Sequence, residues 1–357
     1  MTCETAPVRA GEELNVDSLR DYLREKIEGV EDGITVEQFP SGHSNLTYLL
    51  RTEAGHEYVL RRGPLGPVAP RAHDMAREFR LLQMVHPHFP PAPAVFLLCE
   101  DPAVVGSVFF LMERRHGIIL RDAVPRQLAG LPNYPQLISE AFIDCLARLH
   151  AIDVINTGLV VLGKPENFLA RQVQGWGERW HRAATDDMPK ASAITMDCVI
   201  RWLADRAPVS PSPTLVHNDY KLDNVILRAE SVPSIAAVLD WEMATVGDPL
   251  ADVGLALCYW LWAHTALSHS NALPSLTSEP GWYTRDQFVQ RYAQQTGRDL
   301  SQIEYHEVLG SFKLAVILQQ IYYRFRRGQT TDPRFQNFSE RVQALIETAS
   351  KLTVKLT

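Results

Sequence analysis

Alternating apolar and polar side chains predict strands through much of the first third of the chain. The alternation runs through "ITVEQFPSGHSNLTYLLRT" and "EYVLRR", which flank a turn at residues 53–56. Two further strands are predicted by "PAPAVFLLCEDPAVVGSVFFLMER", with a turn at residues 101–102 between them. Apolar residues recur at helical spacing in residues 15–30 and again in "DMAREFRLLQMV". We therefore expect this part of the chain to be mostly strand, with helical insertions.

Helical spacing dominates after Gln136, for example in "LISEAFIDCLARLHAI", "ASAITMDCVIRWLADRA" and the sequence that follows Asp248. The exception is residues 214–240, where short strand-like stretches enclose a polar segment. The pattern predicts an α+β fold with a small β-rich N-lobe at residues 1–115. A larger helical C-lobe is expected at residues 116–357. This order of lobes is that of the bilobal protein-kinase-like fold.

The polar segment at residues 215–227 is "LVHNDYKLDNVIL". His217, Asp219 and Asn224 have the H-x-D-x-x-x-x-N spacing of the kinase catalytic loop. The next strand ends in "AAVLDWEM", which places Asp240 where kinases carry the aspartate of D-F-G. A polar turn that uses Asn and Asp as turn formers would be the ordinary alternative. The full spacing, followed by an aspartate at a strand end, favours the catalytic loop.

The chemistry of phosphoryl transfer explains why these residue types occur together. The reaction needs positioned phosphates, Mg²⁺ on the phosphate oxygens and a carboxylate directed at the attacking hydroxyl. Asp219 is the candidate for that catalytic carboxylate, and Lys221 is expected to neutralise charge on the transferred phosphate. Asn224 and Asp240 are the candidate Mg²⁺ ligands, because hard cations prefer oxygen ligands.

A phosphate-covering loop is expected in "FPSGHSNLTYLL", between two predicted strands. It lacks the G-x-G-x-x-G pattern, but backbone N–H groups and small hydroxyls can also bind phosphate oxygens. A plain hairpin is the alternative. The candidate ATP-binding residues are Ser41, Gly42, Ser44, Asn45 and Thr47.

"EYVLRR" aligns with the V-A-I-K strand of kinases and places Arg61 at the lysine position. Arg61 shares a strand face with Val59, and Arg62 lies on the opposite face. Glu78, in the following helix, is the candidate ion-pair partner of Arg61. The alternatives are solvated arginines on an edge strand and an exposed helix glutamate.

"FFLMERRHG" leaves a strand just before the helical part, where the hinge between kinase lobes is expected. Adenine would bond to the backbone there and pack against side chains. Met112, Glu113 and Arg115 are the candidate residues, although a core strand that enters a loop would have the same pattern. Further along, Asp248 and Pro249 predict a helix start, and Asp252 is a candidate brace for the catalytic loop.

The motifs together resemble the aminoglycoside phosphotransferase and choline kinase superfamily. The resemblance is carried by "VHNDYKLDNVIL", "VLDWEMATVGDPLADVG" and "SGHSNLTYLLRT", and it covers nearly the whole chain. "YHEVLGSFKLAVILQQIYYRFRRGQT" is most similar to the branch associated with acyl-CoA dehydrogenases. The resemblance implies an ATP- and Mg²⁺-dependent kinase for a small molecule, with nucleotide in the N-lobe and the acceptor in the C-lobe. Two positions depart from it, since Arg61 replaces a lysine and Asn218 replaces a glycine.

Composition narrows the possible partners. The formal net charge is −7, whereas a nucleic-acid binder normally carries an excess of basic residues on its binding surface. The most apolar stretch, "LADVGLALCYWLWAHTAL", predicts a buried helix rather than a membrane span. The five cysteines are far apart and form no C-x-x-C pair, which favours a reduced, cytoplasmic compartment. The sequence does not indicate the oligomeric state.

The acceptor is expected to be a hydroxylated small molecule, such as a hydroxyacyl compound or another amphipathic alcohol. Trp260, Trp262, Trp282 and Tyr283 could form aromatic walls, with Arg324 near an anionic end. These aromatic residues could equally be core. An aminoglycoside kinase and a nucleotide-binding pseudokinase scaffold remain as alternative functions. A protein kinase is disfavoured because Trp241 and Glu242 replace the Phe-Gly of D-F-G and no A-P-E segment follows.

Overall fold

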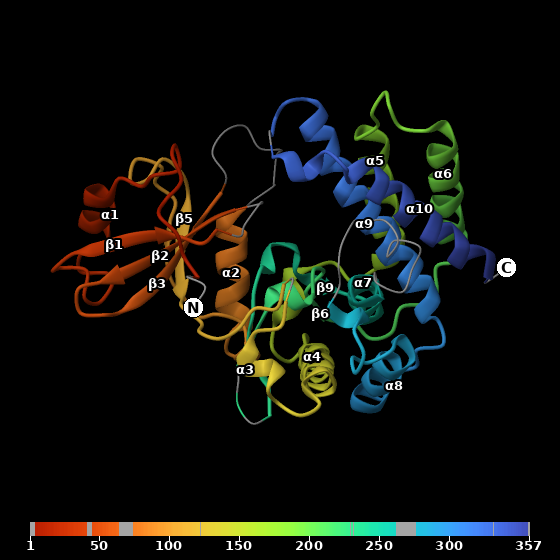
Figure 1. Ribbon diagram of the computed structural model, residues 1–357, viewed down its shortest axis with the longest axis horizontal. Helices are drawn as coiled ribbons and strands as arrows, with labels where there is room; N and C mark the ends of the chain where they lie inside the picture. The colour runs from red at the N-terminus through yellow and green to blue at the C-terminus, as the bar shows by residue number, and fades with distance from the viewer. Residues whose placement is uncertain are drawn as a thin grey trace. The chain divides into compact units, whose positions relative to one another are not determined.

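The computed structural model describes residues 4–40, 45–63, 74–121, 123–228, 230, 232–261, 276–330 and 332–355 of the 357-residue chain. The chain forms two compact units (Figure 1). The first comprises Met1–Gly117 and Ala236–Glu242, and the second comprises Ile118–Ile235 and Met243–Thr357. The first unit thus includes a short segment from the region that we expected to belong wholly to the C-lobe.

The first unit contains a five-stranded antiparallel sheet in the order β1-β2-β3-β5-β4. Its strands are β1 (Ile34–Gln38), β2 (Leu46–Thr52), β3 (Glu57–Arg62), β4 (Val95–Cys99) and β5 (Phe109–Glu113). β3 lies in the middle of the sheet, and its last four residues, Val59–Arg62, are buried. The strands predicted from the alternating pattern are therefore present.

A helix lies on each side of this sheet (Figure 1). On one face, α1 (Val16–Leu23) packs Leu19 and Leu23 into a core with Tyr48 and Leu60. On the other face, α2 (Met75–Val85) approaches β4 and β5. The expected helix at residues 15–30 ends early, because the chain leaves helical geometry at Arg24.

The second unit is mainly helical, as expected. Its helices are α3 (Arg126–Ala129), α4 (Tyr134–His150), α5 (Phe168–Arg182), α6 (Lys190–Asp205), α7 (Pro249–Leu261), α8 (Arg285–Thr296), α9 (Ile303–Arg326) and α10 (Phe338–Lys355). Short strands β6 (Thr214–Val216) and β9 (Thr245–Gly247) pair. This unit also contains β7 (Val225–Arg228), and β8 (Ser234–Val238) runs from it into the Ala236–Glu242 segment of the first unit. Single 3₁₀ turns occur at Leu159–Leu162, Leu222–Asn224, Trp241–Met243, Leu276–Ser278 and Pro333–Phe335.

The long helix α9 forms the centre of the second unit and packs against α5, α6, α7 and α10. It crosses α7 at very short range because glycines lie at the crossing. A Cβ atom added at Gly310 would lie only 2.9 Å from the Cys258 sulfur and from the Gly254 carbonyl oxygen. A Cβ atom at Gly254 would overlap the backbone of His306. The two helix backbones can therefore approach each other closely at this point.

The apolar stretch that begins at Leu250 is a buried helix, as predicted, as far as the end of α7. In the described part of the chain, no helix combines the length and the apolar character that a membrane crossing would need.

Candidate active site

The predicted catalytic loop follows β6 in the second unit and ends in the 3₁₀ turn Leu222–Asn224. Asp252, in the first turn of α7, accepts hydrogen bonds from the backbone N–H groups of His217 (2.6 Å) and Asn218 (2.7 Å). The predicted brace between Asp252 and the loop is therefore confirmed. These bonds and His150 favour the ionised carboxylate and lower the pKa of Asp252, although burial alone would raise it.

Asn218 has a positive φ of 64°. Asparagine tolerates this left-handed conformation better than most residues, which explains why it can replace glycine here. Its side-chain amide donates to the Met243 carbonyl oxygen at 3.1 Å. The turn that leads into Asp219 is thus held by its own side chain as well as by Asp252.

The Asp219 carboxylate accepts hydrogen bonds from three different kinds of donor. Lys221 Nζ lies 2.9 Å from Oδ2 and 3.2 Å from Oδ1, and Asn224 Nδ2 lies 2.8 Å from Oδ2. The Tyr259 hydroxyl donates to Oδ1 at 2.9 Å. Burial raises the pKa of Tyr259, and the nearby Asp219 charge adds to this, so the phenol stays protonated as a donor. The structure therefore brings Asp219, Lys221 and Asn224 together around one carboxylate.

Tyr259 was missed by the sequence analysis. It lies seven residues after Asp252, and this spacing places both residues on the same face of α7. That spacing was a usable signal, because a helix that braces the loop through Asp252 must also direct Tyr259 toward it.

In the first unit, Arg61 Nε donates to Glu78 Oε2 at 3.1 Å, which confirms the predicted ion pair. Arg61 also pairs with Asp240, and Glu242 lies 3.9 Å from the guanidinium. Burial would lower the pKa of Arg61, but the carboxylates of Glu78, Asp240 and Glu242 outweigh it and raise that pKa. Burial raises the pKa of Glu78 to about 7, and the charge of Arg61 opposes this shift.

Arg62 lies on the opposite face of β3, as the strand pattern predicted. It is 1% exposed and donates to the Tyr48 hydroxyl and to the carbonyl oxygens of Glu12 and Val105. The alternative of two solvated arginines is therefore wrong. Arg62 ties the sheet to neighbouring loops of the first unit.

The candidate phosphate loop is described only in part, since Ser41, Gly42 and Ser44 lie outside the described residues. Asn45 Nδ2 donates to Glu242 Oε2 at 2.9 Å. Thr47 pairs with Arg61 in the register between β2 and β3. Glu242, a residue to which we assigned no binding role, thus accepts a hydrogen bond from Asn45 and lies near the Arg61 guanidinium.

The predicted hinge residues have structural contacts within the first unit. Glu113 accepts a hydrogen bond from the Ala94 N–H group at 3.1 Å and forms an ion pair with Arg115 at 2.8 Å. Arg115 also donates to the Pro90 carbonyl oxygen at 2.8 Å. Met112 is buried on β5 opposite Val59. These side chains fix the end of β5, and the role of its backbone in adenine binding stays a prediction.

Asp240 and Asn224 have the hard oxygen ligands that Mg²⁺ prefers. Asn224 directs its amide nitrogen to Asp219, so its Oδ1 is the atom left for a metal. Among the described residues, no group of three or more His, Cys, Asp and Glu side chains could hold a metal by itself. Asp240 in the first unit and Asn224 in the second can thus each supply an oxygen to Mg²⁺, which often binds through one or two side chains together with phosphates and waters.

The aromatic residues expected around the acceptor are mostly interior. Trp260 and Trp282 are buried with ring centroids 5.7 Å apart, and Trp260 also packs against Phe142 at 5.2 Å. For these two tryptophans, the core alternative is therefore correct. Trp262 lies outside the described residues. Tyr283 donates to Glu140 at 2.8 Å.

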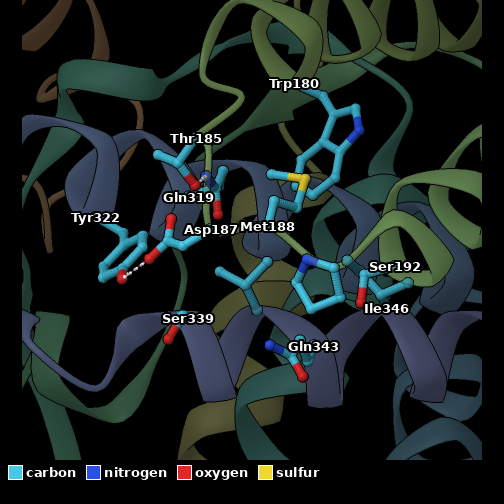
Figure 2. A pocket seen from close by; sticks show the side chains of 12 residues that line it. Trp180, Thr185, Asp187, Met188, Ser192, Gln319, Tyr322, Ser339, Gln343 and Ile346 are labelled. Atoms are coloured by element: carbon cyan, nitrogen blue, oxygen red, sulfur yellow. Dashed lines mark hydrogen bonds between the residues drawn. The ribbon is translucent and has the colours of Figure 1, made fainter. Parts of the chain in front are cut away.

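A shallow hollow lies elsewhere in the second unit, between the end of α5, the start of α6, α9 and α10 (Figure 2). Tyr322 points across it and donates to Asp187 at 2.6 Å. Arg326 also pairs with Asp187. The space that it encloses is about 10 Å³, far smaller than typical ligand pockets, which measure roughly 300–1,000 Å³. We do not assign it to the acceptor.

Comparison with known sequences agrees with these features. The model described as "Phosphotransferase enzyme family" matches residues 35–306. The chain is 33% identical over 355 residues to acyl-CoA dehydrogenase family member 10 of Mus musculus, covering 98% of this chain and 32% of that protein. It is 30% identical over 361 residues to family member 11 of Rattus norvegicus, covering 99% and 45%. The chain thus spans less than half the length of these curated relatives.

Solved structures show the same fold. A Ralstonia eutropha JMP134 protein, provisionally assigned as an aminoglycoside phosphotransferase, aligns with a TM-score of 0.78 and 27% identity over 96% of this chain and 99% of its own. An aminoglycoside phosphotransferase in complex with AMP-PNP and hygromycin B aligns with a TM-score of 0.60 and 17% identity, covering 94% and 98%. The predicted bilobal, protein-kinase-like α+β fold is confirmed.

Proposed function

The chain belongs to the phosphotransferase enzyme family, and from this premise we propose that it transfers the γ-phosphate of ATP, with Mg²⁺, to a hydroxyl group of a small molecule. The observation that carries the proposal is the hydrogen bond from the Tyr259 hydroxyl to Asp219 Oδ1. A carboxylate that accepts an O–H group in this way can equally accept the hydroxyl of an acceptor.

Asp219 acts as the general base or orienting group for the attacking hydroxyl. Such a group must lie within hydrogen-bond reach of the proton that it receives. Lys221, 2.9 Å from the same carboxylate, supplies positive charge for the transferred phosphate. Asn224 holds Asp219 Oδ2 and thereby limits how the carboxylate can turn.

The first unit binds the nucleotide in this proposal. Arg61, held by Glu78, supplies a fixed cation for phosphate oxygens, and its planar guanidinium can contact them in bidentate fashion. Thr47 is opposite Arg61 in the strand register, and Asn45 donates to Glu242, which lies 3.9 Å from the same guanidinium. Both residues are assigned to the phosphates. The complex of a similarly folded phosphotransferase with AMP-PNP supports nucleotide binding.

Asp240 and Asn224 would hold Mg²⁺ through their side-chain oxygens. When bound, the metal neutralises charge on the phosphate oxygens. In the first unit Asp240 pairs with Arg61, so a metal that binds Asp240 competes with the guanidinium for the carboxylate.

The acceptor is proposed to be a hydroxyacyl compound or another amphipathic alcohol. The similarity to acyl-CoA dehydrogenase family members is the support for an acyl group. A polycationic aminoglycoside is the competing acceptor, suggested by the assignment of the Ralstonia protein.

The test is a panel of acceptors incubated with the purified chain, Mg²⁺ and ATP. Formation of ADP and of the phosphorylated product is measured for hydroxyacyl-CoA thioesters, free hydroxy acids, choline and kanamycin-type aminoglycosides. We expect kcat/KM for a hydroxyacyl acceptor to exceed that for any aminoglycoside. Efficient aminoglycoside phosphorylation, at about 10⁴ M⁻¹s⁻¹ or above, would overturn the acceptor assignment. ATP binding without turnover on any acceptor would instead favour a pseudokinase scaffold.

A further inference from the structure

A lysine ammonium group lies buried beneath the catalytic loop. Lys313, on α9, is 5% exposed. Its Nζ donates to the Asn218 carbonyl oxygen at 2.9 Å and to Asn218 Oδ1 at 3.2 Å. These bonds reach the peptide group that joins Asn218 to Asp219. The lysine thus contacts the backbone directly before the candidate catalytic carboxylate.

Lys313 completes a set of contacts around the left-handed residue Asn218. Asp252, from α7, holds the Asn218 N–H group on one side, and Lys313 holds the Asn218 carbonyl on the other. The peptide groups on both sides of this residue are therefore each held by a buried charged side chain. A non-glycine residue in this region needs such support, because its backbone conformation is unfavourable by itself.

Burial of the charged ammonium group at this position costs free energy of folding. Among the described residues, no carboxylate forms an ion pair with Lys313, and its other neighbour is the Trp176 ring, whose centroid lies 5.6 Å away. Burial, assisted by the charge of Arg179 and opposed by Asp252 and Asp219, lowers the pKa of Lys313 to about 8. A methionine would fill a similar volume without this penalty. A side chain retained at a cost in stability indicates a role in function.

We propose that Lys313 is a positioning residue for phosphoryl transfer, which holds the Asn218–Asp219 peptide so that the Asp219 carboxylate keeps its orientation. The inference rests on the proposed function of Asp219. The charged form is the active one in this role, because an ammonium group donates stronger hydrogen bonds to the Asn218 oxygens than a neutral amine does.

Two variants and one control test the role in the full chain. Lys313→Met removes the charge and the donor, and Lys313→Arg keeps both. Gln319→Met is the matched control, because Gln319 is equally buried on α9 and donates to the Ala183 carbonyl oxygen at 2.8 Å, away from the loop. We expect Lys313→Met to lower kcat at least 10-fold, with the KM for ATP and acceptor within about threefold, and without loss of stability in urea unfolding. Lys313→Arg should recover part of kcat, and Gln319→Met should lose stability but keep kcat within about twofold.

The pH profile separates this role from simple packing. The kcat of the wild type should fall as pH rises through about 8, where Lys313 loses its proton. Lys313→Arg should move this fall to higher pH, and Lys313→Met should lack it. A Lys313→Met variant with wild-type kcat, or with the same alkaline fall, overturns the proposal.

Hydrogen exchange gives a readout that needs no turnover. The His217 and Asn218 amides should exchange faster in Lys313→Met than in the wild type, and at the wild-type rate in Gln319→Met. If the wild type phosphorylates no acceptor, the proposed function fails, but faster exchange in Lys313→Met alone still supports the positioning contact. Unchanged exchange in all variants overturns it.

Discussion

At the scale of single residues, the candidate site depends on the Asp219 carboxylate. Asp219→Asn keeps the shape of the side chain and removes the charge that accepts the hydroxyl proton. We expect kcat to fall by about 10² or more, as loss of a general base typically causes, while ATP binding stays within about threefold. Calorimetry of ATP binding and steady-state turnover give the two values. Asp223→Asn, at an exposed position of the same loop, is the control, and equal losses in both variants would argue against Asp219.

Adjacent arginines on β3 should separate nucleotide binding from stability. Arg61→Ala removes the cation beside Glu78 and Asp240, so we expect the KM for ATP to rise about tenfold or more, with a smaller rise in Arg61→Lys. Arg62→Ala leaves the Tyr48 hydroxyl and two carbonyl groups without their donor, which should cost about 2–4 kcal/mol of unfolding free energy. Urea unfolding and ATP titration distinguish the two. The reverse outcome would show that we have assigned the faces of β3 wrongly.

The metal ligands can be tested by binding alone. Asp240→Ala and Asn224→Ala should each reduce the difference between ATP affinity measured with and without Mg²⁺, because each removes an oxygen ligand. Isothermal titration with and without the metal provides this difference. If both variants kept the full wild-type dependence on Mg²⁺, a metal site shared by these two residues would be excluded.

At the scale of elements, the crossing of α7 and α9 determines how the loop is held. Gly310→Ala adds a methyl group 2.9 Å from the Cys258 sulfur and the Gly254 carbonyl, so the two helices must move apart. We expect a loss of about 1–3 kcal/mol in stability, as overpacking typically causes. Because Asp252 and Lys313 reach the loop from these two helices, kcat should also fall.

Gly175→Ala is the matched control for this prediction. Gly175 lies inside α5, and an added Cβ atom would meet only the flexible end of Arg179, at 3.4 Å. Alanine should therefore stabilise the protein by up to about 1 kcal/mol through its helix propensity. Thermal and urea unfolding measure both effects. A stabilising Gly310→Ala would contradict the close crossing.

The contacts that could best be predicted from the sequence lie within one short stretch of the chain or on adjacent elements. The spacing of Asp219 and Asn224, the faces of β3 and the Asp252 brace could all be predicted, because each follows from strand alternation or a local motif. For Tyr259 the only signal in the sequence was its seven-residue spacing from Asp252, and for Lys313 there was none. Their roles depend on how α7 and α9 pack against the loop, and a single lysine in the mainly apolar helical sequence "GSFKLAVIL" carries no local signal of what it contacts.

At the scale of the whole molecule, Lys313 should affect stability as a function of pH. In the folded state burial lowers its pKa to about 8, below the value of 10.5 that applies to an exposed lysine. Below pH 8, Lys313 is protonated in both the folded and the unfolded state. The folded protein then bears the full free-energy cost of burying the charged ammonium group. Between pH 8 and 10.5 the unfolded state binds more protons, so the stability contributed by this group rises with pH.

The unfolding free energy of the wild type is compared with that of Lys313→Met, so that the contributions of the other titrating groups cancel. We expect Lys313→Met to be the more stable protein at pH 7, by about 1–3 kcal/mol, and this advantage to shrink toward pH 10. Urea unfolding at several pH values measures it. An advantage that grows with pH would mean that the folded-state pKa of Lys313 is raised rather than lowered.

The glycine crossing of α7 and α9 also has an evolutionary consequence. Gly254, Cys258 and Gly310 occupy one shared volume, so a larger residue at one of these positions requires a smaller one at another or a wider crossing. A wider crossing would withdraw Asp252 and Lys313 from the loop, and selection for turnover would remove it. Substitutions at these three positions should therefore be correlated among members of the family, although none of the three side chains contacts the Asp219 carboxylate.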